Sequence, residues 1–231
     1  MAGSKYLILY NLAAGTSWAY IFALTVNAIY QGQTTQELWK DVELPLKAAQ
    51  TAAVLEVFHS AFGLVRSPVM TTLMQITSRI WVVWGLLHPV PGPTTSGSIP
   101  LLKLPNFTLK LDLFSLLLAW SITEIIRYSF YALKEAGRAP YFLLWLRYTT
   151  FIVLYPLGVA SELTMAYLAM PTVKKSHLWN ISMPNAVNFS FDYYYLCWLA
   201  IAGYVPGLPQ LYLYMFAQRK KLLGPPKAKR Q

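Results

Sequence analysis

The stretch that decides the fold runs from Tyr141 to Met170 and reads YFLLWLRYTTFIVLYPLGVASELTMAYLAM. It is long and apolar enough to cross a bilayer as a helix, yet it contains Arg147, Tyr155 and Glu162. An ionisable side chain at membrane depth costs on the order of a few kcal/mol, so we interpret it as a functional site. Because Tyr155 and Glu162 are seven residues apart, they share one helix face, roughly 10 Å apart along the axis. The stretch therefore predicts acid–base chemistry inside a membrane.

The composition of the whole chain also indicates a membrane protein. Of its 231 residues, 56% are hydrophobic and 12% are charged, whereas an ordinary soluble domain is about 25% charged. We expect a single domain over residues 1–231, an all-α integral membrane bundle of six transmembrane helices. The predicted spans are residues 6–30, 46–65, 69–87, 109–131, 141–170 and 193–216, and residues 217–231 form a basic cytosolic tail.

Polar or proline-rich segments separate these spans. We expect a loop over residues 31–43, after which Pro45 opens the second span. Arg66-Ser67-Pro68 predicts a tight break, since proline lacks a backbone donor and disfavours helix in the residue before it. Residues 88–106 are rich in proline, glycine and serine and predict a loop without helix, and residues 171–192 are expected to be irregular.

The distribution of basic residues predicts the orientation in the membrane. Six spans put both termini on one side, and basic residues are enriched on the cytoplasmic side. Ten lie on the side of the termini (Lys5, Arg66, Lys134, Arg138, Arg219, Lys220, Lys221, Lys227, Lys229 and Arg230) and six on the other (Lys40, Lys47, Lys103, Lys110, Lys174 and Lys175). We therefore expect cytosolic termini, and we attribute the net charge of +10 to this anchoring and not to nucleic-acid binding.

Four blocks of sequence resemble one known family. They are RYTTF-x2-LYPLG-x3-E (147–162), LEVFHSAFGLVRSP (55–68), WSITEIIRYSFY (120–131) and MPNAVNFSFDYYY (183–195). Together they resemble the 3-hydroxyacyl-CoA dehydratases of the endoplasmic reticulum, also called the protein-tyrosine-phosphatase-like family. The order and spacing of the blocks are most similar to the plant PASTICCINO-type member.

This resemblance implies a hydro-lyase that converts very-long-chain (3R)-3-hydroxyacyl-CoA to trans-2-enoyl-CoA, the third step of fatty acid elongation. The catalytic pair of the family falls on Tyr155 and Glu162. The resemblance implies a multi-pass protein surrounded by the lipid of the endoplasmic reticulum membrane. It also implies three partners, namely the condensing enzyme, the ketoacyl reductase and the enoyl reductase of the cycle. No metal or redox cofactor is expected, because elimination of water needs only an acid and a base.

The residue types fit this chemistry. Dehydration needs a base for the proton alpha to the thioester and an acid for the departing hydroxyl. A buried carboxyl group can serve as either, and tyrosine, whose ordinary pKa is about 10, is a natural hydrogen-bond acid. We favour Glu162 as base and Tyr155 as acid, and the reverse assignment stays open. From their positions alone, Arg127 and Arg147 are predicted to bind the phosphates of CoA.

Purely structural roles compete with these interpretations. Tyr155 alone also fits an ordinary packed tyrosine, and Glu162 alone also fits an ion pair with Arg79. Glu124 is expected to join Arg127 or the adjacent Tyr128 in a network that holds spans together.

Two further motifs receive a structural interpretation. Glu56 and His59 have the spacing of a metal pair, but no second ligand cluster accompanies them, so we expect polar contacts between helices. A tyrosine phosphatase loop needs His-Cys-x5-Arg, and Ser60 stands at the nucleophile position, where serine without a base is a poor nucleophile. The single cysteine, Cys197, lies in an apolar span and is expected to be a buried, inert thiol.

The last residues contain a candidate localisation signal. Lys229 and Lys227 are third and fifth from the end of the sequence and resemble a dilysine retrieval signal for endoplasmic reticulum membrane proteins. A plain positive-inside anchor is the alternative. Two other functions stay open: a scaffold without enzymatic activity, and a transporter that uses buried charges as a relay, although no two-fold repeat supports the latter.

Overall fold

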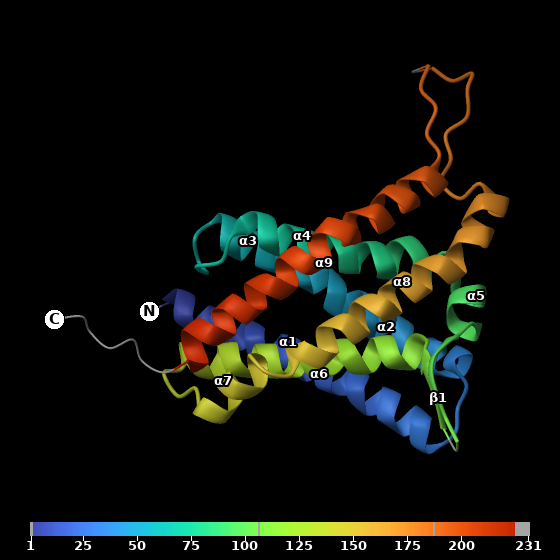
Figure 1. The fold of residues 1–231 in the computed structure, drawn as a ribbon. Coiled ribbons are helices and arrows are strands. Elements are labelled where there is room, and N and C mark those ends of the chain that lie inside the picture. The colour runs from blue at the N-terminus through green and yellow to red at the C-terminus, as the bar shows by residue number, and fades with distance from the viewer. Residues whose placement is uncertain (1, 106, 187, 225–231) are drawn as a thin grey trace.

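The computed structural model describes residues 2–105, 107–186 and 188–224, and this part of the chain is mostly helical (Figure 1). In chain order the elements are α1 (Ala2–Tyr30), α2 (Thr35–Ala53), α3 (Leu55–Ala61), α4 (Val69–Ile80), the π-helix η1 (Trp81–Leu87), α5 (Pro91–Ser96), β1 (Ile99–Leu104), β2 (Phe107–Leu111), α6 (Leu113–Glu135), α7 (Tyr141–Arg147), α8 (Phe151–Ser176) and α9 (Tyr193–Leu223).

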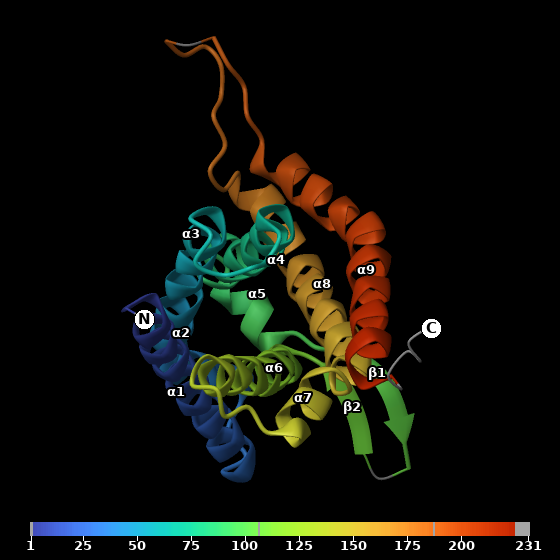
Figure 2. The same ribbon diagram turned by 90° about the vertical axis from the view of Figure 1, so that its left-hand side faces the viewer.

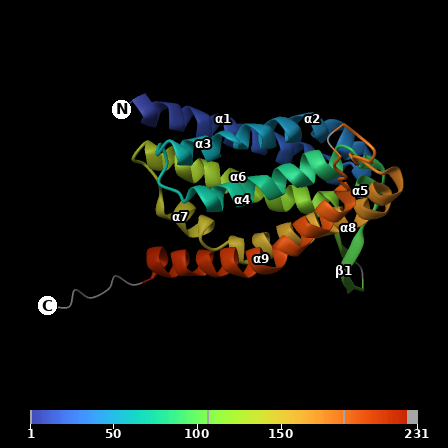
Figure 3. The ribbon, with the colours of Figure 1, turned by 90° about the horizontal axis from the view of Figure 1, so that it is seen from above.

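The helices pack side by side and form a closed ring. Helix α6 packs against α1 and α8, α1 packs against α2, and α4 with η1 completes the ring between α2 and α8. Helix α9 lies outside the ring, along α8 (Figure 2). The start of α1 and the end of α9 lie at the same end of the bundle, while α5 and the two strands lie at the other end (Figure 3).

Four helices are long and apolar enough to cross a membrane: Lys5–Tyr30, Leu113–Glu135, Phe151–Ser176 and Tyr193–Leu223. They overlap the predicted first, fourth, fifth and sixth spans, with different bounds for the last three. The predicted third span, residues 69–87, corresponds to α4 followed directly by η1. A π-helical segment of this kind is rare and recurs at functional sites.

The core lies where α1, α2, η1 and α6 meet. Trp18, Leu38, Val82 and Trp120 are buried there, with Met165 from α8. A smaller cluster joins η1, α8 and the start of α9, and it contains Cys197, which is a free, fully buried thiol. The predicted burial of the cysteine is therefore confirmed.

The predicted loop over residues 31–43 is wrong, because α2 begins at Thr35. The Thr34 hydroxyl accepts a hydrogen bond from the Glu37 amide (3.2 Å), and the Thr34 amide donates to the Glu37 carboxylate (2.7 Å). This capping box satisfies two backbone donors at the helix start. Pro45 lies inside α2 and does not open a span. The helix continues through it, and the buried side of α2 includes Val42 before the proline and Leu46 after it.

The predictions for residues 88–106 and for the start of the fourth span also need correction. Pro91 begins the short helix α5, as proline often does at a first helical position. Antiparallel strands β1 and β2 follow, so residues 109–111 belong to a hairpin and not to a span. Helix α6 starts at Leu113 because Asp112 and Ser115 form a second capping box, with bonds of 2.9 and 3.0 Å. The described chain is therefore not purely α-helical.

The predicted second and fifth spans are each divided into two helices. The second turns at Val54 and ends at Ala61. The fifth is divided between Arg147 and Phe151, where the Leu146 carbonyl accepts from the amides of two threonines and from the Thr150 hydroxyl (2.9 Å). Hydroxyl bonding of this kind competes with the helical ladder. Helices α8 and α9 extend beyond the predicted ends, to Ser176 and Leu223.

Candidate functional site

Glu162 on α8 lies inside the bundle, with only 7% of its surface exposed. The indole N–H of Trp120, on α6, donates to Oε1 at 2.9 Å, and the hydroxyl of Tyr204, on α9, donates to Oε2 at 2.7 Å. Burying a carboxylate without such partners is very costly. Three helices therefore cooperate to place one acidic group in an apolar interior.

Small residues allow α6 and α8 to approach closely at this point. Gly158 is one turn before Glu162, and a Cβ atom added to it lies 3.8 Å from the ring of Trp120. Next to Glu162, the Ser161 hydroxyl bonds to the Ser115 hydroxyl of α6 at 2.8 Å. Small residues at helix contacts are typical of membrane bundles, because they let the backbones come together.

Tyr155 lies two turns before Glu162 on α8 and is held by α9. Its ring stacks on Tyr212 with centroids 5.8 Å apart and an interplanar angle of 11°. The Tyr212 hydroxyl donates to the Ile152 carbonyl at 3.0 Å, the carbonyl whose helical partner is lost because Pro156 has no N–H. The proline and the tyrosine of α9 thus fix the position of Tyr155 together.

Tyr155 and Glu162 lie on the same helix, α8, and Tyr204 reaches Glu162 from α9. Within residues 2–105, 107–186 and 188–224, the Tyr155 hydroxyl has no hydrogen-bond partner. An acceptor or donor that enters the site can therefore bond to it. The arrangement offers one carboxylate and one phenol from the same helix face, and the catalytic roles of this pair stay a prediction.

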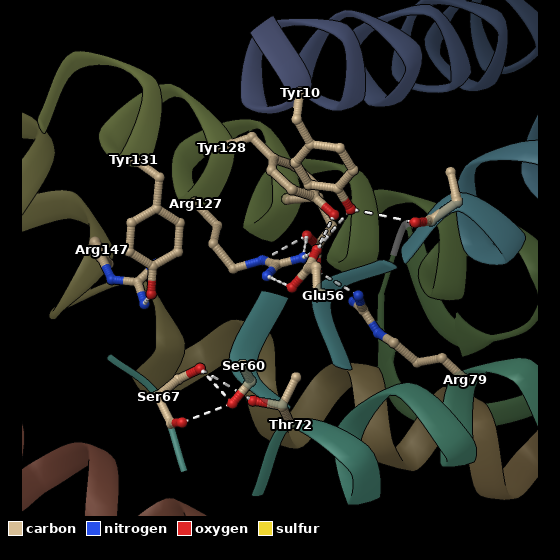
Figure 4. A network of polar contacts seen from close by, with 12 residues as sticks. Tyr10, Glu56, Ser60, Ser67, Thr72, Arg79, Arg127, Tyr128, Tyr131 and Arg147 are labelled. Atoms are coloured by element: carbon tan, nitrogen blue, oxygen red, sulfur yellow. Dashed lines mark hydrogen bonds and ion pairs between the residues drawn. The ribbon is translucent and has the colours of Figure 1, made fainter. Parts of the chain in front are cut away.

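A second polar cluster joins α1, α3, α4 and α6 (Figure 4). Arg127 binds Glu56 through both terminal nitrogens, at 2.5 and 2.9 Å, and donates from Nε to Glu124 at 2.7 Å. Glu124 also pairs with Arg79, and the Tyr128 hydroxyl donates to Glu56. Two carboxylates and two guanidinium groups therefore neutralise each other inside the bundle, which confirms the predicted network around Glu124.

The two arginines predicted to bind CoA lie in different environments. The Arg127 guanidinium donates to two carboxylates through all three of its nitrogens. Arg147 donates to the Tyr131 hydroxyl at 2.7 Å and lies over that ring at 4.4 Å. In the described part of the chain it has no carboxylate partner, and its buried Nε has no acceptor. Phosphate binding by either arginine stays a prediction, but Arg147 has more free donors than Arg127.

The structure shows which partners Arg79, Glu56 and His59 have. Arg79 pairs with Glu124 and not with Glu162, although it stacks on Trp120 with its guanidinium carbon 4.9 Å from the ring centroid. The predicted helix contacts of Glu56 and His59 are confirmed: besides the bonds to Glu56, the Tyr6 hydroxyl and His59 Nε2 lie 2.8 Å apart. No group of three or more potential metal ligands occurs among the described residues.

Sequence reasoning missed Trp120 and Tyr204. Trp120 belongs to one of the four blocks of the family resemblance. Its side chain is apolar apart from the indole N–H, which is the only group through which it can bind a carboxylate. Tyr204 is one of many tyrosines in its span, and no local pattern distinguishes it. The proposed retrieval residues, Lys227 and Lys229, lie outside the described residues.

Comparison with known proteins identifies the family. Residues 50–225 match the family described as "Protein tyrosine phosphatase-like protein, PTPLA". The chain belongs to the PTPLA family. It is 44% identical over 227 residues to the very-long-chain (3R)-3-hydroxyacyl-CoA dehydratase PASTICCINO 2 of Arabidopsis thaliana, covering 98% of this chain and 95% of the relative.

Similarity extends to animal PTPLA proteins. The dehydratase hpo-8 of Caenorhabditis elegans is 44% identical over 232 residues and the full length of both chains. The human very-long-chain (3R)-3-hydroxyacyl-CoA dehydratase 2 is 41% identical over 221 residues, covering 96% of this chain and 82% of the relative. No solved structure matches the chain. The predicted resemblance is thus confirmed, and these relatives carry the name of the expected activity.

Proposed function

We propose that this PTPLA protein is a membrane hydro-lyase that dehydrates very-long-chain (3R)-3-hydroxyacyl-CoA to trans-2-enoyl-CoA in fatty acid elongation. The observation that carries the proposal is similarity over nearly the full length to relatives named for this activity. The site supports it, because Tyr155 and the buried Glu162 lie two turns apart on one helix and supply an acid and a base.

The proposed reaction proceeds by acid–base elimination. Glu162 takes the proton from the carbon alpha to the thioester, and the electrons of that C–H bond form the new double bond. The bond from the beta carbon to its hydroxyl oxygen breaks, and Tyr155 donates the proton with which this oxygen leaves as water. The unpartnered hydroxyl of Tyr155 in the described structure supports this assignment. An acid and a base suffice, so no metal or redox cofactor enters the proposal.

Arg147 is the stronger candidate for the phosphates of CoA. Its guanidinium is held by Tyr131 without a carboxylate counter-ion among the described residues, and arginine pairs well with phosphate. A phosphate at Arg127 would have to displace Glu56 or Glu124 from hydrogen bonds that are already made.

We propose six membrane crossings, with α2–α3 and α4–η1 added to the four long apolar helices. Support comes from the bundle itself, in which the start of α1 and the end of α9 lie at one end (Figure 1). With six crossings and cytosolic termini, Arg66→Cys, between α3 and α4, is labelled by an impermeant maleimide from the cytosolic side and Lys40→Cys only after permeabilisation. If only the four long helices cross, both are labelled only after permeabilisation. The native Cys197 is buried and adds little background. Labelling of both from the cytosolic side would contradict this topology.

We place the protein in the endoplasmic reticulum membrane, beside the condensing enzyme, the ketoacyl reductase and the enoyl reductase of the cycle. Lys227 and Lys229 are the proposed retrieval signal. Their joint replacement by serine is expected to move a tagged protein to later compartments, while a Lys220/Lys221 pair of serine substitutions leaves it in place. Unchanged localisation of the first variant would refute the signal.

The decisive experiment measures conversion of a long-chain 3-hydroxyacyl-CoA to the enoyl-CoA by purified protein in detergent. Tyr155→Phe and Glu162→Gln should each lower kcat by at least about 100-fold, since each removes a proton-transfer group. The matched control is Tyr167→Phe on the exposed face of α8, which should keep wild-type activity. Wild-type protein that binds the substrate without converting it would overturn the proposal in favour of a scaffold.

A further inference from the structure

The donors to Glu162 come from two helices that the reaction scheme does not otherwise use. Trp120 is 2% exposed and rigidly packed, with its N–H on Oε1, and Tyr204 reaches Oε2 from the outer helix α9. An indole nitrogen can only donate, so the bond to Trp120 requires an acceptor oxygen on Glu162. Each carboxylate oxygen has further lone pairs, and one of these stays free to take a proton.

Neighbouring charged groups also hold the indole of Trp120 in place beside the Glu162 carboxylate. The charged and titratable groups around Glu162 are Tyr155, two turns before it on α8, Tyr204, which bonds to it from α9, and Arg79 of α4, which lies over Trp120. Arg79 lies over the face of Trp120 and is itself fixed by its ion pair with Glu124. The indole is therefore held between a cation on its face and the carboxylate at its N–H.

We infer that Trp120 and Tyr204 are positioning residues that hold Glu162 as an oriented carboxylate, ready to act as the base. The inference rests on the proposed function and deepens it, because hydrogen bonds to both oxygens stabilise the ionised group relative to a buried carboxylate without them. A base must be ionised before it can accept a proton, whereas an acid must not. The geometry thus favours Glu162 as base over the reverse assignment with Tyr155.

The first test removes one donor at a time. Trp120→Phe and Tyr204→Phe should each lower kcat about 10- to 100-fold, the effect of losing one hydrogen bond to a charged group, with little change in KM. The acid limb of the pH profile of kcat/KM should move to higher pH, because the carboxylate then loses a proton less readily. The controls are Trp39→Phe and Tyr6→Phe, which remove a buried indole and a hydrogen-bonded hydroxyl elsewhere in the fold.

A double substitution separates positioning from a general structural effect. If Trp120 and Tyr204 act only through Glu162, Trp120→Phe combined with Glu162→Gln should be no slower than Glu162→Gln alone. A further 10-fold loss in the double variant would overturn the inference.

Isosteric replacements test the same point in case a phenylalanine variant does not fold. Benzothienylalanine at position 120 removes only the N–H, and 3-fluorotyrosine at position 204 keeps the shape but makes a stronger donor. The first should move the acid limb to higher pH and the second to lower pH. Unshifted profiles with wild-type kcat would overturn the inference.

The proposed function can fail separately from this inference. Activity at the wild-type level in Glu162→Gln would refute Glu162 as the base and the inference with it. Wild-type activity in both donor variants, while Glu162→Gln is inactive, would refute the positioning role alone.

Discussion

Replacing Arg127 with methionine is the sharpest test of the buried charge network. The substitution keeps an unbranched apolar stem and removes the bonds of the guanidinium to Glu56 and Glu124. Glu124 keeps its other partner, Arg79. Glu56 loses its only ion pair among the described residues and retains hydrogen bonds from Tyr10 and Tyr128. The cost should therefore fall mainly on Glu56.

The magnitude follows from the burial of the pair. Breaking a buried ion pair by removing one partner costs about 3–5 kcal/mol. The side chains of Arg127 and Glu56 are 21% and 15% exposed, so some water reaches them and the lower end, about 3 kcal/mol, applies. For a chain of this size, that loss lowers the melting temperature by about 6–12 °C.

Thermal unfolding in detergent, followed by circular dichroism, measures this effect. Adding Glu56→Gln to Arg127→Met should restore about half of the lost stability, because it removes the unpaired charge. Arg138→Met is the control, since that arginine is exposed. A normal melting temperature for Arg127→Met, together with a raised KM for the acyl-CoA, would refute this reasoning and make Arg127 a ligand of CoA.

Three further outcomes are expected. Arg147→Met should raise KM for the acyl-CoA about 10-fold, the effect of one lost charged contact. The KM for a phosphate-free thioester analogue should stay unchanged. Equal effects on both substrates would contradict phosphate binding. Gly158→Leu should push the facing indole of α6 away and lower kcat at least about 10-fold, whereas Gly203→Leu, which has open space, should leave it unchanged. The Thr34 amide, and to a lesser degree the Thr34 hydroxyl, hold the pKa of the Glu37 carboxylate below its ordinary value. The stabilisation from this cap is therefore complete at pH values above the ordinary pKa of glutamate, and it is lost as the pH falls through the lowered pKa. Melting curves from about pH 7 to about pH 3 should show this loss. Glu37→Gln should remove it, whereas Thr34→Ala, which costs about 1 kcal/mol, should remove only the part that the hydroxyl contributes.

Much of the helical framework can be predicted from hydropathy and from turn residues. Residues 69–87 are helical throughout, and the four long apolar helices lie where runs of apolar residues predict them. The errors come from local chemistry that hydropathy does not measure. A capping box at Thr34 begins a helix inside a polar segment, and α7 ends at Arg147 inside an apolar one.

The candidate site shows a similar division. Spacing along one helix identifies Tyr155 and Glu162, because both lie on α8. Partners from other helices depend on how the bundle closes, and no local pattern gives that. Arg79 illustrates the difficulty: its charge suits Glu162, but the packing places it on Glu124 and over Trp120.

Helix α9 shows how a membrane protein can define the rotation of one helix without a large apolar interface. Three tyrosine hydroxyls bind it to other elements: Tyr193 to the Gly85 carbonyl, Tyr204 to Glu162 and Tyr212 to the Ile152 carbonyl. They fall within an arc of about 100° around the helix axis. Apolar contact with lipid is as favourable as apolar contact with protein, so apolar packing alone leaves the helix free to turn. Turning it would move all three hydroxyls into hydrocarbon without partners, so these bonds select one rotational setting and, with it, the orientation of the carboxylate.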